Sequence, residues 1–220
     1  MTQHSRNADM KILGAFDRLV PSTRELICKL HTPTYIHCKC LSFLARHFGD
    51  FLGFAERDLE ILTLGAYLHD IGKYFISTNI LDKPSELTPE EWKFIKLHPT
   101  VDNSTLCFPK DLEAIIPIIQ CHHERWDGSG YPNGLTKENI PYFARIVQIL
   151  DIYDALTHAR SYKQSFSSEK ALNIILEETA KGWHQPILVE QFVEFIRLQS
   201  EKYPDTINLI HYQSISRNTD

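Results

Sequence analysis

The stretch "CHHERWDGSGYP" (residues 121–132) places two adjacent histidines at the point where a run of isoleucines gives way to a glycine-spaced loop. Ile118 and Ile119 lie four residues before His122 and His123, so all four side chains share the core side of one predicted helix. The helix is expected to end here, with both imidazoles facing inward. A lone inward histidine is more often a hydrogen-bonded core residue than a metal ligand. The other inward polar residues of the chain distinguish between these two interpretations.

Two helices are predicted upstream, over residues 35–51 and 56–71, because apolar residues recur in both at helical spacing. His37 lies on the apolar stripe of the first helix. The stripe of the second runs into His69, with Asp70 next to it. All three side chains are therefore expected to point into the core.

The next signals mark helix ends. Gly72 is available to end the second helix. Thr88 and Glu91 have the spacing of a capping box, which predicts the start of a short helix there. That helix must stop near His98, because Pro99 disfavours helical geometry in the residue before it.

Downstream of the loop the pattern is again helical. Residues 140–156 predict a helix in which Asp151 interrupts an apolar stripe. Two further helices are expected at residues 168–179, behind a Ser167 cap, and at residues 186–197. No segment requires a strand, so the predicted fold class is all-α.

Seven inward polar side chains change the interpretation of the histidines. Burying them together without a cation would cost several kcal/mol and leave most of their lone pairs unsatisfied. Imidazoles and carboxylates suit ions such as iron, manganese, nickel or zinc, and seven ligands exceed what one ion takes, so two ions are predicted. Asp70 is the natural bridge between them, and a shared solvent molecule would ionise near neutral pH to a nucleophilic hydroxide. The seven are His37, His69, Asp70, His98, His122, His123 and Asp151.

Length and composition fit one globular domain. The chain has 220 residues, of which 43% are hydrophobic and 23% charged, and its net charge is −5. This charge argues against nucleic-acid polymers and anionic membranes as partners. The chain shows no apolar run of about 18 residues and no signal peptide, and its five cysteines fit a reducing compartment, so a soluble, cytoplasmic protein is expected. Cys38 and Cys40 are interpreted as small apolar helix residues, because no second pair completes a zinc site.

The motifs resemble those of the HD-GYP family, a branch of the HD-domain metal-dependent phosphohydrolases. They are "HDIGK" at 69–73, "HHERWDGSGYP" at 122–132 and "ARIVQILDIYDALTHARSYK" at 144–163, preceded by His37 and His98. The resemblance implies an HD-domain helical bundle with additional C-terminal GYP-type helices. The predicted organisation is an N-terminal extension over residues 1–32, the HD-GYP domain over 33–205 and a C-terminal tail over 206–220.

The resemblance implies a phosphodiesterase that hydrolyses cyclic di-GMP to pGpG, GMP or both, by attack of a metal-bridging hydroxide. Its cofactors would be two divalent ions, with iron or manganese favoured and nickel or zinc as alternatives. Diguanylate-cyclase (GGDEF) domains are expected partners through the Gly-Tyr-Pro loop. Two alternatives stay open: a low-activity cyclic-dinucleotide sensor or interaction module that retains metals, and a hydrolase of another cyclic dinucleotide.

The resemblance also assigns roles to individual residues. It makes the seven residues above metal ligands, and it makes Asp70 and Lys73 catalytic. The substrate-binding residues would be Tyr131, Arg160 and Lys163. Residues that support the ligands or shape the loop would be Glu124, Asp127, Gly128, Gly130, Pro132 and Asp154.

Three departures from the family pattern qualify these expectations. Pro33 stands where three-metal members carry a glutamate, which favours two metals. Cys38 replaces a usual serine and Asp102 a usual glycine, and both changes are interpreted as structural. Family members commonly carry a receiver or sensor domain ahead of the catalytic part, whereas about 30 residues precede it here. Regulation is therefore expected to be intermolecular, or the chain to be an excised domain.

Overall fold

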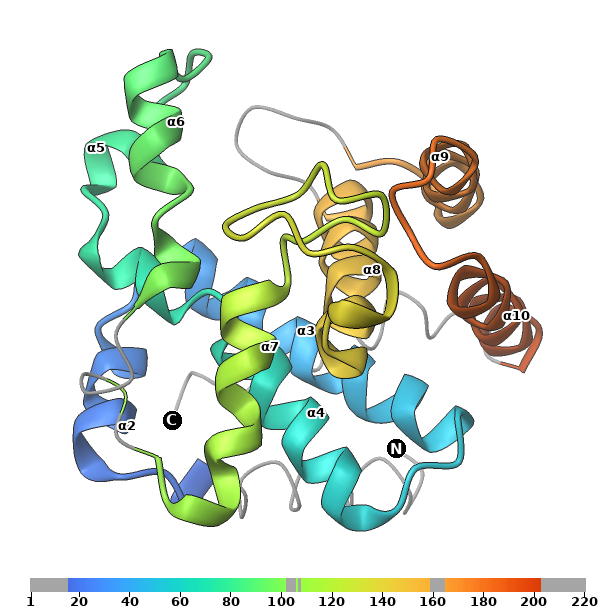
Figure 1. The fold of residues 1–220 in the computed structure, drawn as a ribbon, viewed down its shortest axis with the longest axis horizontal. Coiled ribbons are helices and arrows are strands. Elements are labelled where there is room, and N and C mark those ends of the chain that lie inside the picture. Colours follow the sequence, from blue (N-terminus) through green and yellow to red (C-terminus); the bar gives the residue numbers. More distant parts are fainter. Residues whose placement is uncertain (1–15, 102–105, 107, 159–164, 203–220) are drawn as a thin grey trace.

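The computed structural model describes residues 16–101, 106, 108–158 and 165–202. Every regular element in this part of the chain is helical, which confirms the predicted all-α class (Figure 1). Among these elements none is both long and apolar enough to cross a lipid bilayer. The α-helices are α2 (Pro21–Cys28), α3 (Thr32–Phe51), α4 (Glu56–Leu68), α5 (Thr78–Leu81), α6 (Pro89–Ile95), α7 (Ile116–Cys121), α8 (Tyr142–Thr157), α9 (Ser168–Ala180) and α10 (Pro186–Lys202). The 3₁₀ turns are η1 (Ile71–Phe75), η2 (His98–Thr100), η3 (Lys110–Ile115) and η4 (Lys137–Asn139).

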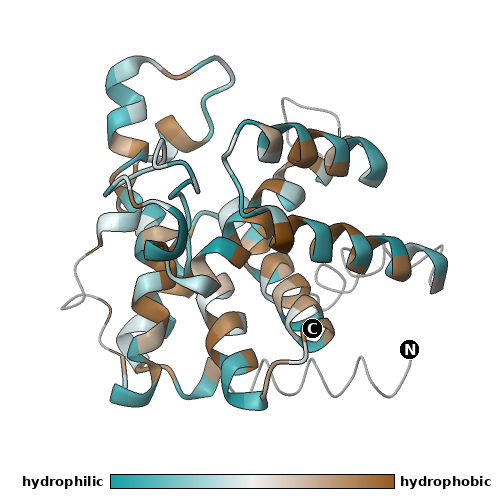
Figure 2. Cartoon of the chain, turned by 45° about the vertical axis from the view of Figure 1, so that its right-hand side comes forward, coloured by the Kyte–Doolittle hydropathy of each residue, from teal (hydrophilic) through white to brown (hydrophobic). Residues whose placement is uncertain are grey.

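Four helices form the centre of the fold. Helix α3 packs along α4, both contact α8, and α7 lies against α4 and α8. Their apolar faces meet in one continuous core that α9 and α10 close from the C-terminal side, and Figure 2 shows the apolar residues as stripes along these helices. Leu19 and Ile27 belong to the same core, although they precede the predicted domain boundary at residue 33. The boundaries at 33 and 205 stay predictions.

The helix ends that surround the central polar cluster are set by local sequence. Helix α4 ends at Leu68, three residues earlier than predicted, so His69 caps it and Asp70 opens η1. The capping box is confirmed, because the Thr88 hydroxyl accepts from the Glu91 amide while the Glu91 carboxylate accepts from the Thr88 amide. The predicted Ser167 cap is also present, with its hydroxyl accepting from the Lys170 amide.

Gly72 does not end a helix, contrary to expectation. It lies within η1, and its backbone is not in the left-handed region. A Cβ atom at this position would come within 2.8 Å of the His98 carbonyl carbon and 2.5 Å of Val101 Cγ2. Glycine is needed because η1 and η2 approach each other through their backbones.

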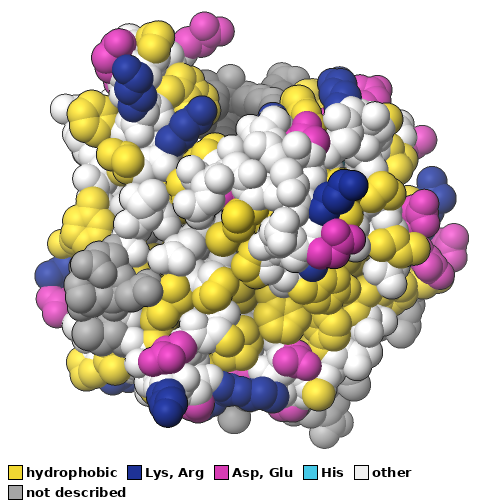
Figure 3. Space-filling view, in the orientation of Figure 1, with side chains coloured by type: hydrophobic (Ala, Val, Ile, Leu, Met, Phe, Trp, Pro, Cys, Tyr) yellow, Lys and Arg dark blue, Asp and Glu magenta, His cyan; other side chains and the backbone are white. Residues whose placement is uncertain are grey.

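Two parts of the chain flank the central helices on the face seen in Figure 1. Helices α5 and α6 project at one corner, where apolar side chains such as those of Phe75, Phe94 and Leu97 are exposed among charged ones (Figure 3). The loop over residues 122–141, drawn in yellow-green, arches over α8 on the side of α9 (Figure 1). The cluster of histidines lies at the foot of this loop.

Candidate metal centre

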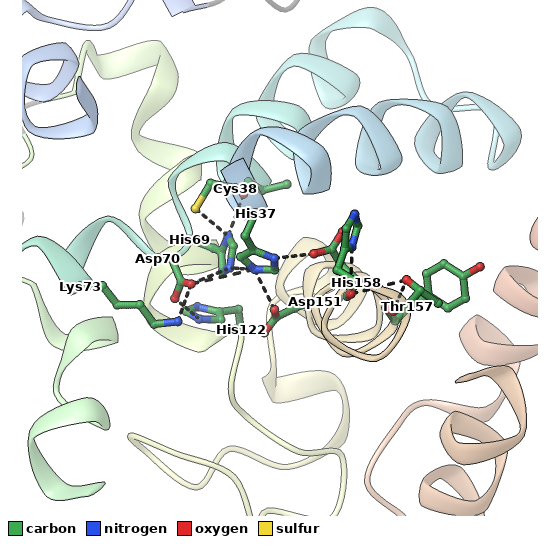
Figure 4. Close-up of polar contacts among 12 residues, drawn as sticks. His37, Cys38, His69, Asp70, Lys73, His122, Asp151, Thr157 and His158 are labelled. Carbon is green, nitrogen blue, oxygen red and sulfur yellow. Dashed lines mark hydrogen bonds and ion pairs between the residues drawn. The ribbon is translucent and has the colours of Figure 1, made fainter. Parts of the chain in front are cut away.

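Asp70 occupies the middle of the cluster, with only 1% of its surface exposed. Its Oδ2 atom lies 3.4 Å from His69 Nε2 and accepts a hydrogen bond of 2.6 Å from Lys73 Nζ. Its Oδ1 atom lies 3.2 Å from His98 Nε2 and 4.0 Å from His122 Nε2. The two oxygens of one carboxylate therefore face different imidazoles, as Figure 4 shows for part of the cluster.

The ligand atoms form two groups that share Asp70. Within each group the ligand atoms lie within 4.8 Å of one another. The sequence-predicted Asp151 joins them from α8, because its Oδ1 lies 3.0 Å from His37 Nε2. The structure thus brings all seven predicted ligands together. One group is His37, His69 and Asp70, and the other is Asp70, His98, His122 and His123.

Three of the imidazoles are oriented by the ends of the helices that carry them. The Nδ1 atoms of His69, His98 and His122 lie 2.7, 2.7 and 2.8 Å from the carbonyl oxygen three residues earlier. The last carbonyls of a helix have no intrahelical partner and only accept, so each ring must donate to them from Nδ1. In the neutral form each ring then turns the lone pair of Nε2 toward Asp70.

A carboxylate orients the fourth imidazole. His37 Nδ1 donates to Asp154 Oδ2 at 2.6 Å, which makes Asp154 a supporting residue, in line with its expected place. His37 Nε2 lies 3.3 Å from His69 Nε2. The Nε2 atoms of the pair His98 and His122 lie 3.2 Å apart.

These contacts fit a bound divalent cation. The neutral rings of His98 and His122 face each other through Nε2, held by fixed Nδ1 partners, and would repel as acceptors unless something positive lies between them. Asp70 Oδ1 is buried and has no hydrogen-bond partner among the described residues. A donor set of imidazoles with a shared carboxylate is typical of sites for first-row transition metals.

Burial and charge prepare most of these groups for metal binding. Burial lowers the pKa of His98 to about 3 and that of His123 to about 4, so both candidate ligands are neutral rings. Burial opposes the charged form of Asp70, but Lys73 and His69 outweigh it and hold the pKa of that carboxyl well below its usual range. Burial also opposes a charge on His37, yet Asp154 and Asp151 raise its pKa to about 10. Without a metal ion this ring keeps a proton that a divalent ion would displace.

Two acidic residues of the loop brace it and lie outside both ligand groups. The Glu124 carboxylate accepts from the amides of Asn133 at 2.7 Å and Leu135 at 3.0 Å. Asp127 Oδ1 accepts from the Ser129 amide at 2.9 Å. Both side chains therefore tie down the loop backbone, as expected for supporting residues.

Gly128 and Gly130 are required in the loop for two different physical reasons. Gly128 has φ +85°, a conformation that favours glycine. Gly130 has no positive φ, but a Cβ atom there would lie 2.5 Å from Glu124 Cα and from the His123 carbonyl oxygen. Gly128 is therefore required for its backbone angle, whereas Gly130 is required for close approach. Pro132 follows Tyr131 through a cis peptide bond.

Tyr131 covers one candidate ligand. Its ring stacks on His123, with centroids 4.8 Å apart and planes at 26°. Lys96 Nζ lies 5.2 Å from the centroid of the same ring, a contact that the sequence patterns did not indicate. In the sequence, Lys96 is recognisable only as a cation at an exposed helix end, two residues before His98. Arg160 and Lys163 lie outside the described residues, as does Asp102.

Comparisons with known proteins identify the family that the chain resembles. The HD domain family matches residues 16–187. The cyclic di-GMP phosphodiesterase response regulator RpfG of Xanthomonas campestris is 33% identical over 179 residues, which cover 77% of this chain and 47% of the relative. The 3'3'-cGAMP-specific phosphodiesterase 2 of Vibrio cholerae is 34% identical over 164 residues, which cover 73% and 31% of the two chains.

A solved structure supports the fold. The HD domain of the phosphodiesterase PgpH from L. monocytogenes superimposes with a TM-score of 0.58 and 17% identity, over 83% of this chain and 99% of that domain. The chain spans half or less of the length of the curated relatives that it matches, with 47%, 29% and 46% covered in three of them.

Proposed function

We propose that this chain, which belongs to the HD-domain family and to its HD-GYP branch, is a metal-dependent phosphodiesterase that hydrolyses cyclic di-GMP to pGpG, GMP or both. The observation that carries the proposal is the position of Asp70. Its two oxygens face two imidazole groups, as a carboxylate that bridges two ions would. The names of relatives such as RpfG support the substrate class.

The residues would divide between two ions. His37, His69 and Asp151 would hold one, His98, His122 and His123 the other, and Asp70 would bind both. We favour iron or manganese for this mixed nitrogen and oxygen set, with nickel or zinc as alternatives. When bound, such ions supply Lewis acidity and generate hydroxide near neutral pH.

The surrounding side chains would bind and orient the dinucleotide. Lys73 Nζ is already beside Asp70 and is partly exposed, so it can reach a phosphoryl oxygen above the centre. Tyr131 offers an aromatic ring at the same place. Arg160 and Lys163 are proposed phosphate contacts from the family resemblance. The loop that carries Tyr131 is the proposed contact for diguanylate-cyclase domains.

A second candidate substrate is 3'3'-cGAMP. It is favoured by relatives whose names specify this dinucleotide, including the Vibrio cholerae phosphodiesterase 2. The metal chemistry proposed above acts on the phosphodiester, which both dinucleotides share. The choice between guanine and adenine would rest on contacts outside the metal centre.

The proposal is tested by product analysis with the purified chain loaded anaerobically with iron or manganese. We expect cyclic di-GMP to be converted to pGpG or GMP faster than 3'3'-cGAMP or cyclic di-AMP, and chelated protein to be inactive. Cleavage of 3'3'-cGAMP alone would replace the substrate with the second candidate. Tight binding of cyclic di-GMP without cleavage by any metal-loaded form would instead identify a sensor.

The metal content is expected to be about two ions per chain. Pro33, in the first turn of α3, cannot ligate a third ion, and the nearby His31 is engaged with Asp82 at 2.8 Å. Elemental analysis of metal-loaded protein after gel filtration measures this ratio. A reproducible value near three would mean that another side chain takes the place of the missing glutamate.

A further inference from the structure

His184 is a buried histidine outside the metal centre and outside every motif of the family pattern. It lies in the turn between α9 and α10, with 1% of its surface exposed. Its Nδ1 atom lies 3.0 Å from Gln148 Oε1, and its Nε2 atom lies 3.1 Å from Glu178 Oε2. Both ring nitrogens therefore have close partners, one on α8 and one on α9.

The direction of these hydrogen bonds follows from their partners. Gln148 Nε2 donates to the main-chain carbonyl oxygen of Glu124. Because a carbonyl only accepts, the amide of Gln148 must turn its nitrogen to Glu124 and its oxygen to His184. The Glu178 carboxylate also accepts, so both ring nitrogens of His184 face acceptor oxygens.

This chain of hydrogen bonds ends at the base of the loop. Glu124 directly follows the candidate ligands His122 and His123. Its carboxylate accepts from the amides of Asn133 and Leu135 and so holds the second half of the loop. Gln148 on α8 thus holds the main chain of Glu124, and the Glu124 carboxylate in turn holds the second half of the loop.

A second set of contacts joins the same two segments. The Trp126 amide donates to the Trp183 carbonyl oxygen at 2.9 Å, and the Arg125 guanidinium lies 3.6 Å from the centroid of the Trp183 ring. The turn over residues 181–185 therefore contacts the start of the loop at two consecutive residues, Arg125 and Trp126. Figure 1 shows this turn, between α9 and α10, beside the loop.

We infer that His184 is a positioning residue: through Gln148 it fixes the backbone at Glu124 and so holds the loop, with Tyr131, over the metal centre. The inference rests on the proposed function for its kinetic consequence. His184 itself touches neither metal ligands nor the region where substrate would bind. Its loss is expected to change substrate affinity and the order of the loop, while most of the bound metal remains.

The test uses tryptophan fluorescence as a reporter of the loop. Trp126 and Trp183 both belong to the contact, and Trp92→Phe removes the remaining tryptophan of the chain, which is half-exposed on α6. In this background we compare His184→Phe, which keeps a ring but loses both ring nitrogens, with Ile175→Val, a core change on α9. Ile175→Val removes one buried methylene group and so reproduces a small general loss of stability.

The expected result for His184→Phe is increased acrylamide quenching and a KM for cyclic di-GMP raised on the order of tenfold, with little change in metal content. Ile175→Val should change neither quenching nor KM. If His184→Phe behaves like Ile175→Val in both measurements, His184 is a stabilising core residue only, and the inference is wrong.

A second variant keeps the test decisive if His184→Phe does not fold. Gln148→Glu still accepts from His184 but can no longer donate to the Glu124 carbonyl, so it should reproduce the increased quenching. Unchanged quenching in Gln148→Glu would overturn the proposed route. Because quenching is measured without substrate, it tests the positioning role even if the wild type cleaves no cyclic dinucleotide. That result would refute the proposed function alone.

Discussion

Asp70→Ala is expected to lower phosphodiesterase turnover by on the order of 10³-fold or more and to leave the chain with little bound metal. Each oxygen of Asp70 faces a different imidazole group, so a single substitution removes a ligand from both proposed ions. It also leaves Lys73 without its carboxylate partner. Elemental analysis and steady-state hydrolysis of cyclic di-GMP measure the two effects on the same preparation.

The matched control is Asp58→Ala. Asp58 is an exposed carboxylate in the first turn of α4, the helix that ends two residues before Asp70, so its loss removes an equal charge far from the centre. This variant should keep wild-type metal content and turnover. Full metal content and full activity in Asp70→Ala would rule out Asp70 as the bridging ligand.

Gly72→Ala is expected to be the second most damaging change, although it adds only a methyl group. The new Cβ would meet the main chain of His98, with the carbonyl carbon at 2.8 Å, and a backbone cannot move aside as a flexible side chain can. Such overpacking typically costs about 1–3 kcal/mol. Because the displaced residue is itself a candidate ligand, we expect a lower Tm and loss of the ion held by His98, His122 and His123.

Gly53→Ala separates this clash from the general cost of replacing glycine. Gly53 has φ +76°, and a Cβ atom there would meet nothing within 4 Å, so alanine at this position only incurs backbone strain of about 1 kcal/mol. Thermal melting and metal content are measured for both variants. Equal metal content in the two would show that the approach of η1 to η2 does not position His98.

Six of the seven candidate ligands could be found from the sequence because each lies on or next to a helix with a clear apolar stripe, and His98 because Pro99 marks a helix end beside it. Helical periodicity shows that His37 or Asp151 points inward without any knowledge of the partner helix. Periodicity does not show which oxygen of Asp70 faces which imidazole, because that depends on how α4, α6 and α7 pack. The orientation of the rings by helix-end carbonyls is local, but it depends on the side-chain rotamer, which periodicity does not give.

Other features were missed because their cause lies in distant segments. The sequence suggested that Gly72 ends a helix, whereas the constraint comes from His98, 26 residues later. Gln148 and His184 are single polar residues in segments whose pattern indicates only helix or turn. Their role follows only from the hydrogen bonds that connect them to Glu124. Lys96 was likewise indistinguishable from an ordinary surface cation before its place near Tyr131 was known.

The candidate ligands come from five separate places between residues 37 and 151, most of them at the ends of different helices. Two ions held there would act as cross-links that close long loops of the chain, and closing such loops restricts the unfolded state more than the folded one. Binding energy at the centre would then also be folding energy. The supply of metal in the cell would accordingly set how long each molecule survives against unfolding and proteolysis, as well as how fast it works.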